Sequence, residues 1–295
     1  MRVLVGSNMG LSAQNEEVFT LLKKARKQNP DAKIYIFGST IHNPIYLKQY
    51  EDYNYEIVED LKEIRRLSKT IKTAVVIFSS EGVEEEVEAT LKERKIKYYD
   101  ATYTRTRTVR KNIKKQLKTK RQVIYLGDKD AYETKVTLSI SDKILFIDAN
   151  ENDLSSYEIK KNAVVYNSIL LDELRITRIL SKIREKQSDI EYVENYSPIL
   201  ISRQNNFQEV GNQKYLVLVG NKNSTSIQRL LEYEKIWFPD RPHLIFASPE
   251  EVLKFVEEYG IEYDKGVFIN SGTSTTEEET LAVAECFRKL KKPRD

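Results

Sequence analysis

The chain repeats one pattern, in which a short run of apolar and β-branched residues leads into a small polar loop and then an amphipathic charged stretch. This alternation is typical of βα units that form a largely parallel sheet. The clearest strand-like runs are 3–5, 33–37, 74–78, 123–126, 216–219 and 266–269. We therefore predict an α/β fold. We expect ligands at the carboxyl ends of the strands, where loops and helix N-termini converge.

The length permits more than one compact unit. A single hydrophobic core usually stops growing near roughly 250 residues, and the chain has 295. No stretch rich in Pro, Gly or Ser marks a boundary. We place boundaries near residues 100 and 196, which gives units 11–100, 101–196 and 197–295, with strand 1–6 expected to join the third unit.

Charge and cysteine content exclude several classes of protein. The 48 basic and 45 acidic side chains leave a net charge of +3, which predicts no bulk attraction to polyanions. The single cysteine, Cys286, excludes a disulfide framework and any multi-cysteine metal site within one chain.

No apolar run approaches the roughly 20 residues of a membrane span, and the N-terminus does not resemble a signal peptide. We expect a cytoplasmic protein without a membrane partner.

Two hydroxyl-rich loops are the most specific local signals. Residues 220–226 (GNKNSTS) and 270–276 (NSGTSTT) each join a predicted strand to a predicted helix. One such loop most often only caps its helix, but two on neighbouring βα units could close on one anion. The acidic run 277–279 suits a first helical turn. Neither loop has the glycine spacing of a nucleotide-binding fingerprint.

Three further residues are candidates for a role in the site. His42, with Asn43 beside it, follows a predicted strand, and a ligand role there is about as plausible as a structural one. Glu81 and Glu133 each follow a strand as well, and two carboxyls that point to one centre would permit acid/base chemistry. A solvated glutamate remains the ordinary alternative for each. We interpret His243 as structural.

The segment 105–121 contains nine Lys or Arg residues. Val109, Ile113 and Leu117 recur every four residues within it and supply a buried stripe, so a solvated helix face explains the charges. Nucleic acid is a disfavoured partner.

Together these motifs resemble the 4-hydroxy-3-methylbut-2-enyl diphosphate reductase family (IspH or LytB) from residue 1 to about residue 290. The similar segments are MGLSA (9–13), IHN (41–43), FSSEGV (78–83), DATY (100–103), GDKDAYE (127–133), RQ (203–204) and the two hydroxyl loops. The resemblance implies three α/β units with mostly parallel sheets around a central cleft, the trefoil of that family.

The resemblance also shows where this chain departs from its family. The family holds an iron-sulfur cluster with three cysteines, and the matching positions here are Ser12, Tyr103 and Ser197. Hydroxyl oxygens are poor ligands for such a cluster, so we expect no cofactor and no reductase chemistry. Tyr103 is more simply a ring that fills the vacated space.

The family's diphosphate-binding residues are retained in part. The resemblance implies a ligand-binding role for His42, Asn43, Asn223, Ser224, Ser226, Ser274 and Ser168, the last paired with Asn167 to assist Glu133. Two of the family's histidine positions read Glu81 and Ala131, and an ionised Glu81 would repel a diphosphate.

Three functional hypotheses follow. The leading one is a cluster-free relative that binds a small phosphorylated or anionic ligand, with Glu133 and Glu81 as non-redox acid/base candidates. The second is a non-catalytic regulatory module that uses the basic face 105–121 to bind RNA or an acidic protein. The third is a cluster shared between chains through Cys286. The ligand's identity, turnover and the oligomeric state stay open.

Overall fold

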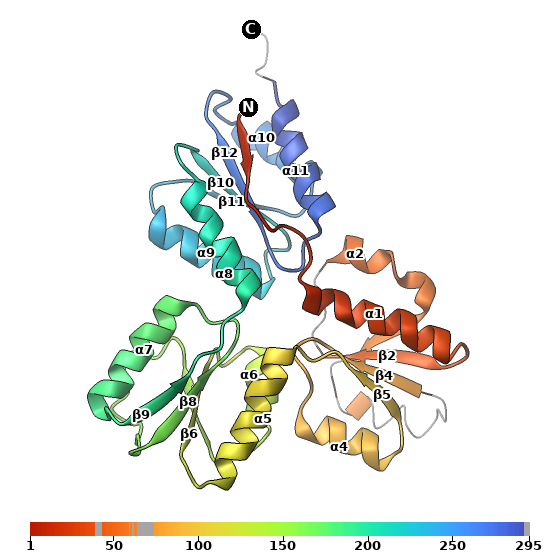
Figure 1. Ribbon diagram of the computed structural model, residues 1–295. Coiled ribbons are helices and arrows are strands. Elements are labelled where there is room, and N and C mark those ends of the chain that lie inside the picture. Colours follow the sequence, from red (N-terminus) through yellow and green to blue (C-terminus); the bar gives the residue numbers. More distant parts are fainter. Residues whose placement is uncertain (39–42, 59, 61, 64–73, 292–295) are drawn as a thin grey trace. The chain divides into compact units, whose positions relative to one another are not determined.

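The computed structural model describes residues 1–38, 43–58, 60, 62–63 and 74–291. His42 lies outside the described residues. The described chain forms three four-stranded sheets in which every neighbouring pair of strands is parallel. Helices lie beside these sheets (Figure 1). The predicted α/β class with three largely parallel sheets is confirmed.

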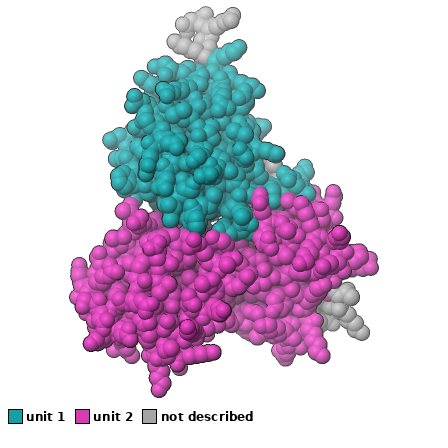
Figure 2. Space-filling view, viewed as in Figure 1, with its two compact units in different colours: residues 1–15, 41–49, 197–295 teal, residues 16–40, 50–196 magenta. Residues whose placement is uncertain are grey.

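The chain divides by its contacts into two compact units, shown in different colours in Figure 2. Unit 1 contains residues 1–15, 41–49 and 197–295, and unit 2 contains residues 16–40 and 50–196. The predicted boundaries at residues 100 and 196 and the predicted cleft stay predictions.

Unit 1 contains one sheet of strand order β1-β12-β10-β11. The strands are β1 (Val3–Val5), β10 (Tyr215–Val219), β11 (His243–Phe246) and β12 (Val267–Ser271). The helices are α2 (Pro44–Lys48), α8 (Pro198–Asn205), α9 (Thr225–Trp237), α10 (Pro249–Tyr259) and α11 (Glu277–Lys289), with the 3-10 turn η2 (Asn206–Glu209). The N-terminal strand β1 pairs with β12, so the two ends of the sequence share one sheet.

Unit 2 contains the other two sheets, of order β3-β2-β4-β5 and β7-β6-β8-β9. The first has β2 (Lys33–Phe37), β3 (Tyr55–Val58), β4 (Ala74–Phe78) and β5 (Lys97–Asp100), with α1 (Ala13–Gln28, which starts in unit 1), η1 (Glu51–Tyr53) and α4 (Glu85–Glu93). The second has β6 (Val123–Gly127), β7 (Ile144–Asp148), β8 (Ala163–Asn167) and β9 (Ile190–Val193), with α5 (Thr104–Lys118), α6 (Tyr132–Leu138) and α7 (Glu173–Lys186).

The central strands are buried on both faces, as parallel strands covered by helices must be. In β10 the alternation of side chains sends Val217 and Val219 into the core with α10 and α11. Leu216 and Leu218 pack on the opposite face with α8 and α9. The sheet of unit 1 is therefore the middle of three layers, with helices on both faces. The edge at which the strands end, their carboxyl edge, is occupied by loops.

Helix α5 confirms the buried stripe expected in the basic segment. Val109 and Ile113 are buried against β6 and β8, and Leu117 packs at the edge of the same cluster. Charged side chains occupy the outer face. In the described part of the chain, no helix has the length and apolar content needed to cross a bilayer.

Candidate functional site

The two hydroxyl-rich loops meet in unit 1. They follow β10 and β12, which are neighbours in register, with Val219 opposite Ser271. The Thr275 hydroxyl donates to the carbonyl of Val219 at 2.9 Å. The backbone amide of Thr273 donates to the hydroxyl oxygen of Ser226 at 3.0 Å. The loops therefore form one hydroxyl-rich surface at the carboxyl edge of the sheet. This is expected because loops that follow neighbouring parallel strands lie at the same edge.

Gly220 makes the close approach of the two loops possible. Its φ angle is +144°, and a Cβ at this position would lie 2.6 Å from the Thr275 hydroxyl oxygen. Glycine meets both conditions because it has no Cβ. Any larger residue would push apart the two segments that carry the candidate site.

The side chain of Ser224 does not cap its helix. Ser224 is the N-cap residue of α9 but accepts no hydrogen bond there from a backbone amide of the helix. Its hydroxyl instead lies 3.1 Å from that of Ser226, and both residues are buried. Capping, the simpler sequence interpretation, is therefore wrong for this side chain. The positive N-terminal end of α9 lacks a side-chain cap beside two paired hydroxyls.

Helix α11 provides the contrast. Thr276 accepts from the amide of Glu279, and the Glu279 carboxylate accepts from the amide of Thr276, which completes a capping box. The acidic run 277–279 occupies the first turn, as predicted. Of the two helix starts, only that of α9 lacks a side-chain cap.

Two asparagines brace the Ser274 segment. Asn15 donates to the Thr273 carbonyl at 3.1 Å and to the Ser274 hydroxyl at 3.3 Å. Asn43 donates to the Ser274 carbonyl at 3.0 Å and to Glu279 at 2.7 Å, and its oxygen accepts from the amide of Tyr46. Both Asn43 donor hydrogens are thus engaged with protein atoms, so Asn43 supports the loop. Asn15 was not predicted from the sequence, where its only signal is its place three residues after Ser12.

Asn223 lies apart from the paired hydroxyls. Its side chain is exposed, and its backbone amide donates to the side chain of Asn221 at 2.9 Å. The hydrogen bond shapes the turn before Ser224. Of the predicted ligand residues in unit 1, Ser224, Ser226 and Ser274 thus lie together on the contacting loops.

Glu133 lies in a buried polar cluster of unit 2. It is 3% exposed, in the first turn of α6, and accepts from the Ser168 hydroxyl and from the amide of Ile169 at 3.4 Å. The side-chain amide of Asn167 donates to the Ser168 carbonyl at 2.8 Å and so fixes the backbone of Ser168. Burial raises the pKa of Glu133, and the hydrogen bond from Ser168 opposes that rise. Ser168 and Asn167 therefore hold the carboxyl in place.

Glu81 lies within electrostatic reach of Glu133. Its Oε2 atom is buried and has no hydrogen-bond partner in the described chain. Burial and then the nearby Glu133 carboxyl raise the pKa of Glu81 to about 8. Neither glutamate is a solvated surface residue. At neutral pH the Glu81 side chain is mostly the neutral acid, so the repulsion of anions expected from an ionised Glu81 is largely removed.

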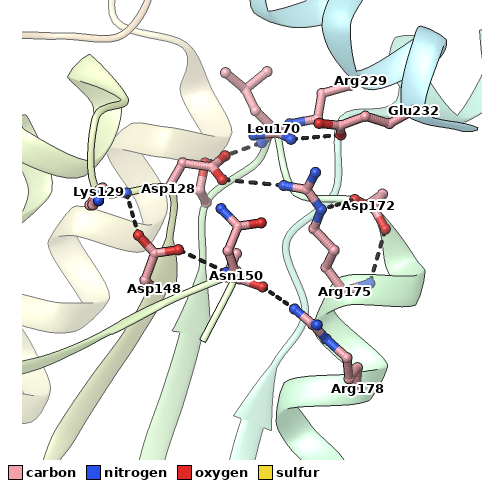
Figure 3. A network of polar contacts seen from close by, with 12 residues as sticks. Asp128, Lys129, Asp148, Asn150, Leu170, Asp172, Arg175, Arg178, Arg229 and Glu232 are labelled. Carbon is pink, nitrogen blue, oxygen red and sulfur yellow. Dashed lines mark hydrogen bonds and ion pairs between the residues drawn. The ribbon is translucent and has the colours of Figure 1, made fainter. Parts of the chain in front are cut away.

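A polar network orders the loop that leads to Glu133 (Figure 3). Arg175 of α7 contacts Asp128 at 3.2 Å and Asp172 at 3.3 Å. Asp148 accepts from the backbone amides of Lys129 and Asn150 at 3.2 and 2.7 Å. These contacts tie together the carboxyl ends of β6, β7 and β8.

The positions that correspond to the family's cluster cysteines have other contacts. Ser197 caps α8 by accepting from the amide of Leu200, and buried Ser12 accepts weakly from the amide of Asn15 at 3.4 Å. Tyr103 is half-buried, and its amide donates to the carbonyl of Ser80 at 2.8 Å. These side chains offer hydroxyl oxygens and no thiolate, which does not match the donor chemistry of an iron-sulfur cluster.

The environment of Cys286 disfavours metal binding by its thiol. Its side chain packs at the edge of the core between α10 and α11, and burial raises the pKa of the thiol. A raised pKa disfavours the thiolate that binds metals. No group of three or more His, Cys, Asp or Glu side chains that could hold a metal ion is found among the residues described.

The basic face of α5 is partly neutralised. Arg110 and Lys114 both pair with Glu85, at 2.9 and 2.7 Å, and Arg107 pairs with Asp100 at 3.2 Å. Of the remaining charges, Lys115 and Lys118 are exposed. The solvated-face interpretation agrees with this arrangement.

Comparison with known sequences points to one family. The sequence model of a family described as LytB protein matches residues 7–288. A 4-hydroxy-3-methylbut-2-enyl diphosphate reductase of Alkaliphilus oremlandii is 23% identical over 276 residues, which is 93% of this chain and 95% of the relative. The corresponding reductase of Campylobacter fetus is 22% identical and covers 81% of this chain and 82% of its own.

Solved structures show the same fold. The E-1-hydroxy-2-methyl-but-2-enyl-4-diphosphate reductase of Plasmodium falciparum has a TM-score of 0.80 at 17% identity, over 95% of this chain and 86% of that one. A second structure, of (E)-4-hydroxy-3-methyl-but-2-enyl diphosphate reductase, has a TM-score of 0.67 at 18% identity, over 98% of this chain and all of that one. At such low identity the likeness establishes the fold alone.

Proposed function

Because this chain belongs to the LytB protein family, we propose that it is a cluster-free member that binds a small phosphorylated or other anionic ligand and is not a reductase. We propose the absence of a cluster because positions 12, 103 and 197 are not cysteines. The reductases among its relatives are named for a diphosphate substrate. The ligand class is proposed in keeping with those names.

The hydroxyl pair at the start of α9 is the observation that carries the proposal. Ser224 stands at the N-cap, yet its hydroxyl faces Ser226 and leaves the helix start without a side-chain cap. Backbone amides and the helix dipole at such an end attract anions. The Ser274 hydroxyl, on the contacting loop, adds a third donor. His42 is proposed as a further donor on the grounds of the resemblance.

The proposed chemistry, where a reaction accompanies binding, is non-redox. Glu81 and Glu133 are the acid/base candidates because Glu133 and the Oε2 atom of Glu81 are buried, the two carboxyls interact, and the pKa of each is raised. Hydration, dehydration and phosphate-ester cleavage need a proton donor and acceptor but no electrons. A Glu133→Gln variant that retained full activity in any such reaction would remove Glu133 from this role.

Ligand-induced stabilisation tests the binding proposal. The melting temperature is measured with inorganic phosphate, pyrophosphate and isoprenoid diphosphates, in wild type and in Ser224→Ala and Ser274→Ala. A ligand at about 100 times its Kd stabilises the native state by about 2.7 kcal/mol, which corresponds to roughly 5 to 10 °C. We expect this shift in wild type and its loss in both variants.

The matched control is Ser188→Ala, because Ser188 is an exposed serine of unit 2. It should retain the full shift. No shift with any of these anions in wild type would refute the proposal, and a shift that both serine variants keep would place the ligand elsewhere.

A further inference from the structure

Arg203 of α8 is a fully buried cation. It is 0% exposed, and its guanidinium donates to the carbonyls of Ser271, at 2.7 Å, and Gly10. Its Nε atom is buried without a hydrogen-bond partner. No carboxylate in the described part of the chain lies within ion-pair distance of it. Its only partners in those residues are neutral carbonyls.

This arrangement leaves a positive charge uncompensated inside unit 1. Buried charges are ordinarily paired, because carbonyl dipoles replace only part of the lost hydration. Burial lowers the pKa of Arg203 to about 10, and no carboxylate counteracts it. The side chain is still protonated at neutral pH. A buried charge of this kind favours an anion nearby.

The charge contacts the segment that carries one of the two hydroxyl-rich loops. Ser271, which accepts from Arg203, is the last residue of β12 and leads into the 272–276 loop. Gly10, the other acceptor, lies two residues before Ser12, whose amide donates to the carbonyl of Thr273. Arg203 therefore holds the segment that continues into the loop of Ser274, and a second segment that is hydrogen-bonded to that loop.

The acidic residues close to this loop do not neutralise Arg203. The Glu279 carboxylate accepts hydrogen bonds from the Asn43 side chain and from the backbone amide and hydroxyl of Thr276. It is therefore engaged in the capping box and not with Arg203. Glu277 has its Cβ 3.7 Å from the position of a Cβ on Gly10, but its side chain is exposed.

We propose that Arg203 is a specificity-determining residue that makes the loops of unit 1 prefer a dianionic group, such as a phosphomonoester, to a monoanion of the same shape. Arg203 does not touch the ligand. Its charge acts through space, behind Ser271 and Gly10. This inference rests on the proposed function, because it assumes that the ligand binds at the Ser224, Ser226 and Ser274 hydroxyls.

Phenyl phosphate and phenyl sulfate provide a matched pair of probes. Near pH 8 the first carries close to two negative charges and the second carries one, because the second pKa of a phosphomonoester is about 6. Two unit charges about 10 Å apart at an effective dielectric constant of about 20 change affinity about tenfold. We expect wild type to bind the phosphate about tenfold more tightly than the sulfate in calorimetric titration.

The variants separate charge from geometry. Arg203→Met removes the charge but fills much of the space, and should bring the two affinities within about twofold of each other. Arg203→Lys keeps the charge and should preserve most of the preference. Ser224→Ala should weaken both ligands alike, because it removes a hydroxyl and leaves the charge in place. Unfolding curves establish that each variant is folded.

Several outcomes would overturn the proposal. Equal affinities in wild type refute it even if Arg203→Met fails to fold. An unchanged preference in a folded Arg203→Met variant refutes it too, as does complete loss of the preference in Arg203→Lys, which would indicate a geometric role. If wild type binds both esters through Ser224 without a preference, the proposed function survives and the role of Arg203 fails. If wild type binds neither ester, the role of Arg203 fails, and the proposed function is decided by the melting temperatures with phosphate, pyrophosphate and isoprenoid diphosphates.

Discussion

Replacing Glu81 by glutamine should stabilise the protein at neutral and alkaline pH. In the native state Glu81 is half-buried, its Oε2 atom is buried without a hydrogen-bond partner in the described chain, and its pKa is raised from 4.5 to about 8. In the unfolded chain the same carboxyl ionises near its ordinary pKa. The native state therefore binds more protons than the unfolded state between these two values. Stability must fall as the pH rises through that window.

The magnitude follows from the size of the shift. Each unit of pKa difference corresponds to about 1.4 kcal/mol. Between about pH 5 and about pH 8 the Glu81 contribution should lower the free energy of unfolding by about 3 kcal/mol. Glutamine cannot ionise, so the Glu81→Gln variant should lack this contribution. The difference in stability between the variant and wild type should therefore grow across this range and level off above it.

Urea unfolding at a series of pH values measures the effect. The quantity of interest is the free energy of unfolding of Glu81→Gln minus that of wild type at each pH, because other titrating groups largely cancel in it. Glu85→Gln is a suitable control, since Glu85 is a glutamate of unit 2 paired with Arg110 and Lys114. A flat difference for Glu81→Gln, or one that declines with pH, would show that Glu81 is ionised in the folded protein.

Three further predictions concern other parts of the structure. Ser168→Ala should destabilise the protein by about 1 to 3 kcal/mol in urea unfolding, because it leaves the buried Glu133 carboxyl short of a hydrogen bond, and a loss below 0.5 kcal/mol would contradict that contact. Gly220→Ala should cost roughly 2 kcal/mol or more and weaken phosphate binding, because its Cβ would lie 2.6 Å from the Thr275 hydroxyl oxygen at a φ of +144°. An unchanged melting temperature and an unchanged affinity for phosphate in Gly220→Ala would refute the close approach of the two loops. Wild type and Lys115→Glu/Lys118→Glu should show equally weak, salt-sensitive retention on RNA, whereas strong retention lost in the variant would favour the regulatory hypothesis.

The fold was largely predictable because its strands carry their own signal. The runs 33–37 and 74–78 match the central strands β2 and β4, since parallel strands buried on both faces are continuous apolar segments. The run 3–5 matches β1, an edge strand whose three half-buried residues are all apolar. Other edge strands carry less signal. β5, with sequence KYYD, has two adjacent tyrosines between two charged residues and lies at the edge of its sheet, so its sequence alone does not indicate a strand.

The candidate site was predictable in its residue types but not in its contacts. The positions of Ser224 and Ser274 at strand ends followed from the pattern alone. The sequence could not show that the Ser224 hydroxyl pairs with that of Ser226 instead of capping the helix, nor that Ser226 accepts from the amide of Thr273 on the other loop. Asn15 contacts Ser274 across 259 residues of sequence, which no local pattern encodes. The pKa of Glu81 likewise depends on tertiary burial.

Whether the chain holds a cluster is tested most directly by the iron and acid-labile sulfide content of the purified full chain after anaerobic reconstitution with iron and sulfide. We expect no stoichiometric iron, because positions 12, 103 and 197 offer only hydroxyls and the Cys286 thiol is packed at the edge of the core. We also expect the same preparation to bind phosphate through Ser224. A bound cluster in the reconstituted wild type would refute the cluster-free proposal, and its loss in Cys286→Ser would assign the cluster to a site shared between chains.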